Sequence, residues 1–149
     1  MRCAGIKCGE GTNILGPIYI SDDATVSIGS CCWIGAKLTI YGGGEVNIGS
    51  NIFISPEAAF ITSSHEVSEN ELCRAGRPIS FKISVGDGCW IGTRATVMGN
   101  TNIGAGAVIG ACALVNKSLD GNAVYGGVPA SDLGLRHSRL TQAGTRAGA

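Results

Sequence analysis

An aliphatic residue recurs every six positions through most of this 149-residue chain. From residue 85 the repeat is unbroken, and a mostly small residue lies four positions after each aliphatic one. The aliphatic positions of this run are Val85, Ile91, Val97, Ile103, Ile109 and Val115. An earlier stretch has the same spacing in three registers, which comprise Ile14, Ile20 and Val26, then Ile28, Ile34, Ile40 and Val46, then Ile48, Ile54 and Phe60.

A period of six matches neither an α-helix, with 3.6 residues per turn, nor a long strand, with a period of two. It predicts a short strand followed by a tight turn, with three such units in each coil of a triangular solenoid. Stacked coils would pair as parallel strands about 4.8 Å apart. The aliphatic residue would fill the interior, where each buried Val or Ile contributes roughly 1.5–3 kcal/mol. The expected fold is therefore all-β.

Glycine accounts for 24 of the 149 residues, about twice its usual share. Because 44% of the residues are hydrophobic and only 15% are charged, the chain does not have the composition of a disordered segment. Glycine often follows the repeating aliphatic residue directly, as at Gly86, Gly92, Gly104 and Gly110. We expect these glycines to supply backbone angles that other residues resist at the corners of the solenoid.

The charges argue against two classes of protein. The 11 basic and 11 acidic residues balance, and no run of Lys or Arg is present, so we expect no nucleic-acid partner. No apolar stretch approaches the ~18 residues of a membrane-spanning helix. Residues 1–7 lack the apolar core of a signal peptide. The sequence therefore predicts a cytoplasmic protein without a membrane partner.

Seven cysteines lie at positions 3, 8, 31, 32, 73, 89 and 112, and they form no Cys-x-x-Cys pair. Zinc sites need thiolates clustered at short spacing, so we expect no metal site. Free, buried thiols that act as small apolar residues are the expected state of these side chains.

The segments from Val85 to Gly92 and from Ile103 to Ala111 resemble the hexapeptide-repeat acyltransferases. The resemblance extends over about residues 10–130 and implies a left-handed parallel β-helix, usually trimeric. Its left hand rests on the resemblance alone, because general connection rules favour right-handed crossovers. We assign residues 1–130 to this domain. Residues 131–149 leave the repeat, and their glycines weaken a helix, so we expect a mobile tail in which His137 has no function.

The repeat is interrupted once, over about residues 61–84, where we expect a protruding loop. Loops that leave a rigid scaffold often carry function, and this one contains His65. The residues from Ile54 to Glu57 and from Ile61 to His65 resemble the segment that carries the catalytic histidine of sugar and capsular O-acetyltransferases. The alternative for His65 is a polar residue at a loop edge that makes only local hydrogen bonds.

The resemblance implies direct transfer of an acetyl group from acetyl-CoA to a hydroxyl group, with His65 as the general base. An ordinary imidazole titrates near pH 6.5, so at pH 7 it is largely neutral and can accept the hydroxyl proton. Glu71 is one candidate to orient the ring, and a backbone carbonyl would serve equally well. The donors that stabilise the oxyanion are left open.

The resemblance also implies an acetyl-CoA site in the second block of repeats. The implied residues are Trp90, Thr93, Gly110, Ala111, Asn116 and Lys117. Lys117 could approach a phosphate, and an exposed lysine at the end of a coil is the alternative. Trp33 and Trp90 share the context Cys-Trp-Ile-Gly. Outward aromatic residues on a prism favour burial by another subunit, so we expect a homotrimer.

The acceptor is open at this point. The acceptor-binding Asn and Asp of galactoside and maltose acetyltransferases correspond to Lys37 and Gly43, where the run from Gly42 to Gly44 replaces polar residues. A hydroxyl group of a sugar or of a similar small molecule is the first expectation. An antibiotic or amino acceptor, and a β-helix scaffold without catalytic activity, are the alternatives.

Overall fold

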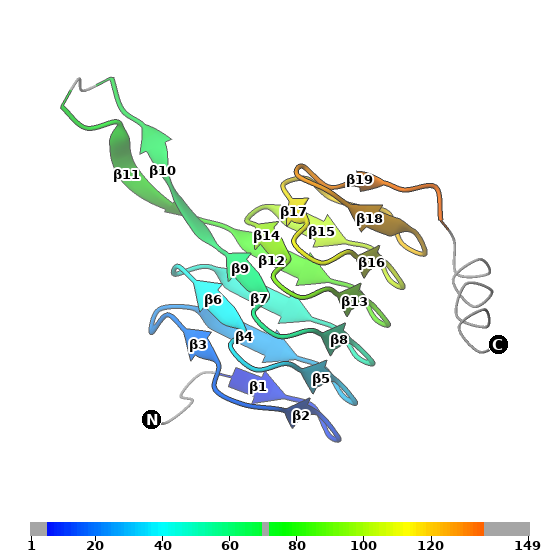
Figure 1. Cartoon of the computed structure of the whole chain (residues 1–149). Helices are drawn as coiled ribbons and strands as arrows, with labels where there is room; N and C mark the ends of the chain where they lie inside the picture. The colour runs from blue at the N-terminus through cyan, green and yellow to red at the C-terminus, as the bar shows by residue number, and fades with distance from the viewer. Residues whose placement is uncertain (1–5, 70–71, 136–149) are drawn as a thin grey trace.

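A computed structural model of the chain describes residues 6–69 and 72–135. All regular structure in this part is β-strand, and the strands wind into a triangular prism of stacked coils (Figure 1). Three parallel sheets form the walls of the prism. This architecture agrees with the left-handed parallel β-helix expected from the sequence.

Each coil contributes one strand to each wall. Sheet A comprises β1 (Ile6–Cys8), β4 (Thr25–Ile28), β7 (Glu45–Ile48), β12 (Lys82–Val85) and β15 (Thr101–Ile103). Sheet B comprises β2 (Asn13–Ile14), β5 (Trp33–Ile34), β8 (Phe53–Ile54), β13 (Trp90–Ile91), β16 (Val108–Ile109), β18 (Val124–Gly126) and the antiparallel β19 (Ser131–Asp132). Sheet C comprises β3 (Tyr19–Ile20), β6 (Thr39–Tyr41), β9 (Ala59–Ile61), β14 (Thr96–Met98) and β17 (Leu114–Val115). We call the turns between these sheets the A–B, B–C and C–A corners.

The register of the strands explains why the repeat restarts within the first block. Val85 pairs with Ile103 after 18 residues, the length of three hexapeptides. In the earlier coils, Val26 pairs with Val46 after 20 residues. The two additional residues lie at the C–A corner, which the chain crosses between β6 and β7. The six-residue phase is therefore kept along each wall and shifted only at this corner.

The repeating aliphatic residues form the core, as the periodicity predicts. Those of the central coils are at most 4% exposed, and they include Ile34, Ile40, Ile54, Phe60, Ile91, Val97, Ile103 and Ile109. The small residues four positions further on are buried as well, among them Cys89, Ala95 and Ala107. Ile14 is 39% exposed and Ile20 half-buried, because β2 and β3 belong to the first coil and have a neighbouring coil on one side only.

The glycines that directly follow the aliphatic residues have a different role from the one expected, whereas Gly88 and Gly106 do adopt positive φ at corners. Eight non-glycine residues of the described chain occupy the left-handed φ region, including Lys37, Glu57 and Arg94. Gly86 and Gly92 are not among the residues with positive φ. A Cβ atom on Gly92 would lie 2.6 Å from the backbone nitrogen of Ala111 in the next coil. The expectation for these glycines is therefore wrong, because they make room for the close approach of neighbouring coils.

The prediction of buried thiols is wrong for four of the six described cysteines, although all six are free. Cys32 and Cys89 are buried because they take the small inward position of the repeat. Cys31 and Cys112 are exposed at corner positions with φ of 57° and 59°, from which the side chain points away from the interior. Cys8 and Cys73 are exposed on the first strand and on the excursion described next.

One excursion leaves the prism, at the C–A corner between β9 and β12 (Figure 1). It is a two-stranded antiparallel hairpin of β10 (Ser63–Val67) and β11 (Ala75–Ser80). The excursion is narrower than residues 61–84, because Ile61 still belongs to β9 and the ladder of sheet A resumes at Lys82. Its strands pair with each other and project away from the stacked coils.

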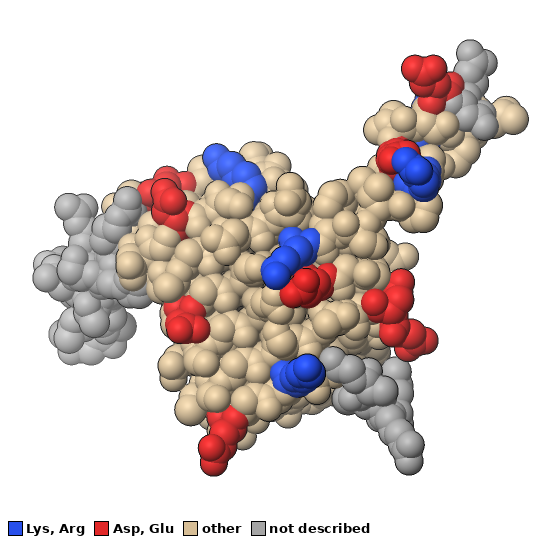
Figure 2. Space-filling view, turned by 180° about the vertical axis from the view of Figure 1, so that it is seen from behind, with Lys and Arg blue, Asp and Glu red and all other residues tan. Residues whose placement is uncertain are grey.

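Charge is sparse on the surface of the prism. Figure 2 shows acidic and basic side chains of both signs scattered singly or in small groups, with no continuous band on that face. In the part of the chain that the structure describes, no helix is long and apolar enough to cross a membrane.

The clearance role of the corner glycines can be tested with Gly86→Ala. The new Cβ would lie 2.6 Å from the backbone nitrogen of Ala105, and backbone atoms of a ladder cannot shift freely. Overpacking of this kind costs about 1–3 kcal/mol. We expect a lower thermal midpoint by circular dichroism, whereas Asn102→Ala, on the exposed face of β15, should leave it unchanged. Equal midpoints for the two variants would show that the coils tolerate a side chain at Gly86.

Candidate active site

His65 lies in β10, where it is held by the opposite strand of the hairpin. The strands place Ser63 opposite Ser80 and His65 opposite Pro78. The His65 Nδ1 atom lies 2.7 Å from the carbonyl oxygen of Gly76. Because a carbonyl oxygen can only accept a hydrogen bond, Nδ1 must carry the proton that is donated to it. The Nε2 atom of a neutral ring is then left with its lone pair, as a general base requires.

The residue that orients His65 was one of the points left open by the sequence. The carbonyl of Gly76 takes this place in the structure, and it is one of the two alternatives considered above. Glu71, the other alternative, lies outside the described residues. Glu66, next to His65 in the chain, forms an ion pair with Arg77 across the hairpin at 2.8 Å. A carbonyl group has no sequence signal, because every residue carries one.

The His65 side chain is exposed in the single chain, because the hairpin that carries it projects from the prism (Figure 1). The described part of one chain therefore holds the histidine in a defined orientation without enclosing it.

Four of the six residues implied for acetyl-CoA lie together on sheet B and the B–C corner. Trp90 is the first residue of β13 and donates a hydrogen bond from Nε1 to the Ser55 Oγ at 3.2 Å. The Thr93 carbonyl accepts a hydrogen bond at 2.8 Å from the backbone of Cys112, so Thr93 and Ala111 lie in neighbouring coils of the same corner. Gly110 begins that turn directly after β16. Thr93 and Ala111 are exposed along this edge.

Trp90 continues a column of outward aromatic side chains on sheet B. In the ladder, Trp33 pairs with Phe53 and Phe53 pairs with Trp90. The rings of Trp33 and Phe53 stack with centroids 6.4 Å apart and planes inclined by 10°. All three side chains are between 45% and 51% exposed. Sheet B therefore presents an apolar aromatic strip to its surroundings.

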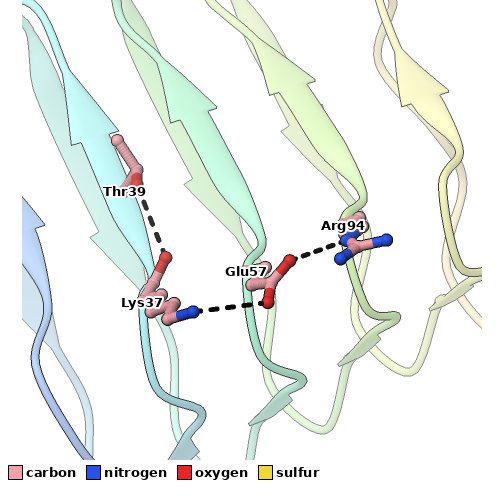
Figure 3. A network of polar contacts seen from close by, with 4 residues as sticks. All are labelled: Lys37, Thr39, Glu57 and Arg94. Atoms are coloured by element: carbon pink, nitrogen blue, oxygen red, sulfur yellow. Dashed lines mark hydrogen bonds and ion pairs between the residues drawn. The ribbon is translucent and has the colours of Figure 1, made fainter.

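A ladder of charges runs along the same B–C corner (Figure 3). Glu57 lies between two cations, with Oε1 3.8 Å from Lys37 Nζ and Oε2 2.6 Å from Arg94 Nε. The hydrogen bond from Arg94, and then its charge, lower the pKa of the Glu57 carboxyl from its ordinary value. The three residues come from three successive coils, so the ladder links the coils beside Thr93.

Asn116 and Lys117 lie elsewhere, at the C–A corner that follows β17. Both are exposed. Lys117 lines a surface depression together with Asp120, Tyr125 and Asp132. Thus a single chain brings Trp90, Thr93, Gly110 and Ala111 together at one corner, and it places Lys117 and the hairpin of His65 along another corner.

A second depression lies where the hairpin joins the prism, at the corner that contains Gly43. It is lined by Thr25, Gly43, Gly44, Glu45, Ser80, Phe81 and Lys82. The run from Gly42 to Gly44 was its only sequence signal, and the meaning of that run depends on the hairpin that packs above it. Between residues 6 and 135, outside the two undescribed positions 70 and 71, no three His, Cys, Asp or Glu side chains gather in a group that could hold a metal ion.

Comparison with known proteins places these features in a family. Residues 82–117 match the family described as "Bacterial transferase hexapeptide (six repeats)". The chain is 34% identical to galactoside O-acetyltransferase of Escherichia coli K12 over 121 residues, which cover 81% of this chain and 59% of that protein. It thus spans about three fifths of the length of that relative.

Two further similarities agree. The putative colanic acid biosynthesis acetyltransferase WcaF of Escherichia coli K12 is 32% identical over 130 residues, which cover 87% of this chain and 69% of that protein. A solved structure of a galactoside acetyltransferase in complex with coenzyme A is 30% identical, with a TM-score of 0.75, over 86% of this chain and 64% of that one. With its repeats, its prism and these relatives, the chain belongs to the bacterial hexapeptide-repeat acetyltransferase family.

Proposed function

We propose that the protein transfers an acetyl group from acetyl-CoA to a hydroxyl group of a sugar or a similar small acceptor. The observation that carries the proposal is the hydrogen bond from His65 Nδ1 to the Gly76 carbonyl, which leaves Nε2 as a proton acceptor. The relatives that are named acetyltransferases, and the coenzyme A bound in a solved relative, support the donor. We place the reaction in the cytoplasm, where acetyl-CoA is available.

In the proposed step, the acceptor oxygen attacks the thioester carbonyl carbon while His65 Nε2 takes the hydroxyl proton. The new C–O bond forms, the C–S bond breaks, and the proton held by His65 passes to the departing thiolate of coenzyme A. Base assistance of this kind contributes typically ~10²–10⁴-fold to the rate. The hydrogen bond at Nδ1 keeps the ring in one orientation and would strengthen when the ring becomes positively charged.

For the donor, we propose that the arm of acetyl-CoA lies along the B–C corner. Trp90 would offer an apolar surface, and the turns at Thr93, Gly110 and Ala111 would offer an exposed edge that an extended arm can follow. Asn116 and Lys117 would approach the nucleotide end, where the lysine ammonium suits a phosphate.

His65 and the residues proposed for acetyl-CoA form one site only where two copies of the chain meet. His65 projects from the C–A corner, whereas Trp90 and Thr93 lie on sheet B and the B–C corner. We propose that the hairpin of one subunit reaches the B–C corner of the next in a homotrimer. The exposed aromatic strip of Trp33, Phe53 and Trp90 supports this arrangement, because a subunit contact would bury it.

The proposed base is tested with His65→Ala. We expect turnover of acetyl-CoA with an acceptor to fall by at least ~10²-fold, while coenzyme A binding measured by calorimetry stays unchanged. Ser64→Ala is the matched control, because Ser64 is an exposed neighbour on the opposite face of β10. A His65→Ala protein that turns over at the wild-type rate would refute the role of this histidine.

The proposed assembly is tested by sedimentation equilibrium at micromolar concentration, where we expect three times the mass of the chain. Replacing the aromatic strip by charge, in Trp33→Glu with Phe53→Glu, should yield monomers because two buried charges would be left unpaired. Glu10→Lys, an exposed change near the A–B corner, is the control and should remain trimeric. Monomeric wild-type protein would contradict the proposal.

A further inference from the structure

The depression at the base of the hairpin contains an ion pair. Its two charged side chains are Glu45, the first residue of β7, and Lys82, the first residue of β12. They are neighbours in the ladder of sheet A, and Thr25 continues their column in the coil before. The column lies just beyond the C–A corner from which the hairpin departs.

The glycines of this corner allow neighbouring segments to pack closely at the base of the hairpin. A Cβ atom on Gly44 would collide with the carbonyl oxygen of Phe81, and one on Gly43 would collide with the Asp23 carboxylate. A Cβ atom on Gly42 would in the same way meet Ser63, the first residue of β10. The base of the hairpin thus packs directly on backbone, and Gly43 and Gly44 contribute no side chain to the depression that they line.

Both side chains of the ion pair have unused hydrogen-bonding positions. Glu45 Oε1 accepts hydrogen bonds from Lys82 Nζ at 3.1 Å and from Asn47 Nδ2 at 2.6 Å. Among the described residues, no hydrogen bond reaches Glu45 Oε2, and Lys82 Nζ uses one of its three donors on Glu45. The hydrogen bond from Asn47, and then that from Lys82, lower the pKa of the Glu45 carboxyl, so the carboxylate is ionised at neutral pH.

His65 lies on the face of the hairpin that borders this depression. Ser63 lies over Gly42, on the side of the preceding coil. Side chains two positions apart in a strand share a face, so His65 lies on the same face as Ser63. Ser80, the cross-strand partner of Ser63, lines the depression. His65 lies two residue steps along the strand from Ser63, which corresponds to about 7 Å between their backbones.

We propose that Glu45 and Lys82 bind a second hydroxyl group of the acceptor while its reacting hydroxyl faces His65. This inference rests on the proposed function and names the acceptor as a polyhydroxylated ring. A hydroxyl group both donates and accepts, so it can donate to the free carboxylate oxygen and accept from the ammonium.

Other acceptors fit this pair less well. The opposite charges of Glu45 and Lys82 largely cancel, so the pair offers no net attraction to an acceptor charge of either sign. An alcohol with a single hydroxyl group would leave the pair without a ligand. A pair of opposite charges with unused bonding capacity therefore selects a neutral polyol.

The experiment uses full-length protein and measures release of coenzyme A. The probes are methyl glucoside, methyl galactoside, methyl N-acetylglucosaminide and the series of deoxy analogues that each lack one hydroxyl of the best of these acceptors. In the wild type, we expect one deoxy analogue that still reacts to have kcat/KM lowered roughly tenfold. In Glu45→Gln with Lys82→Met, we expect the kcat/KM values of parent and analogue to differ by less than about twofold, because the side chains that bind this hydroxyl in the wild type have been replaced.

Three controls keep the result interpretable. Glu10→Gln removes an exposed carboxylate at the A–B corner, away from the proposed site, and should leave the ratio of parent to analogue at the wild-type value. Coenzyme A binding and the thermal midpoint of the double variant should match the wild type. Glu45→Asp with Lys82→Arg, which keeps both charges, should restore part of the discrimination.

The outcomes separate this inference from the proposed function. A wild-type protein that transfers acetyl groups to none of the glycosides, and to no other alcohol, would overturn both. A wild type that transfers acetyl groups, and whose discrimination among deoxy analogues survives in the double variant, would overturn only the role of Glu45 and Lys82. Discrimination that is present in the wild type and in the control variants, and is lost only in the double variant, supports the proposed role of Glu45 and Lys82.

Discussion

Every other feature of this protein depends on the stacking of one coil directly on the next. Parallel ladders hold neighbouring coils at a single strand spacing, about 4.8 Å, so each aliphatic residue lies above another of its kind. Val26, Val46 and Ile83 are successive members of one such column. The spacing also dictates where side chains are forbidden, because the corner at Gly92 approaches Ala111 too closely for a Cβ atom. The repeat of aliphatic residues and the excess of glycine are thus two consequences of one packing constraint.

The same rigidity allows a single excursion to carry function. A hairpin that leaves a wall of hydrogen-bonded strands and rejoins it in register has both of its ends fixed. Ile61 closes β9 and Lys82 opens β12, and the two strands between them pair with each other. That pairing brings the Gly76 carbonyl to His65 and holds the ring without a carboxylate partner in the described chain. The early coils are 20 residues long, and their two additional residues lie at the C–A corner. The base of the hairpin packs against this corner.

Individual residues show which features of the structure could be predicted from the sequence. The core could be predicted almost position by position, since Ile34, Ile54 and Ile91 recur at a fixed period and are fully buried. The cysteines could not, because Cys31 and Cys32 are adjacent in the chain and only the second takes the inward position. The period distinguishes inward from outward slots in a strand, but at a corner the outcome depends on φ. His65 was found from its place in the interruption, whereas Glu45 and Lys82 were missed because they lie 37 residues apart within regular repeats.

The sequence by itself determined the solenoid, the inward residues and the single place where the chain leaves the prism, because these follow from local periodicity. It also determined the family, through the hexapeptide repeats of residues 82–117 and the similarity to known acetyltransferases. Only the tertiary structure decided which group orients His65, why Gly42 to Gly44 lack side chains, and which charged residues border the hairpin. Those answers depend on contacts between coils and across the hairpin, and a period along the chain contains no information about them. The tertiary structure also separated His65 from Trp90 and Thr93, since successive walls of a prism face different directions.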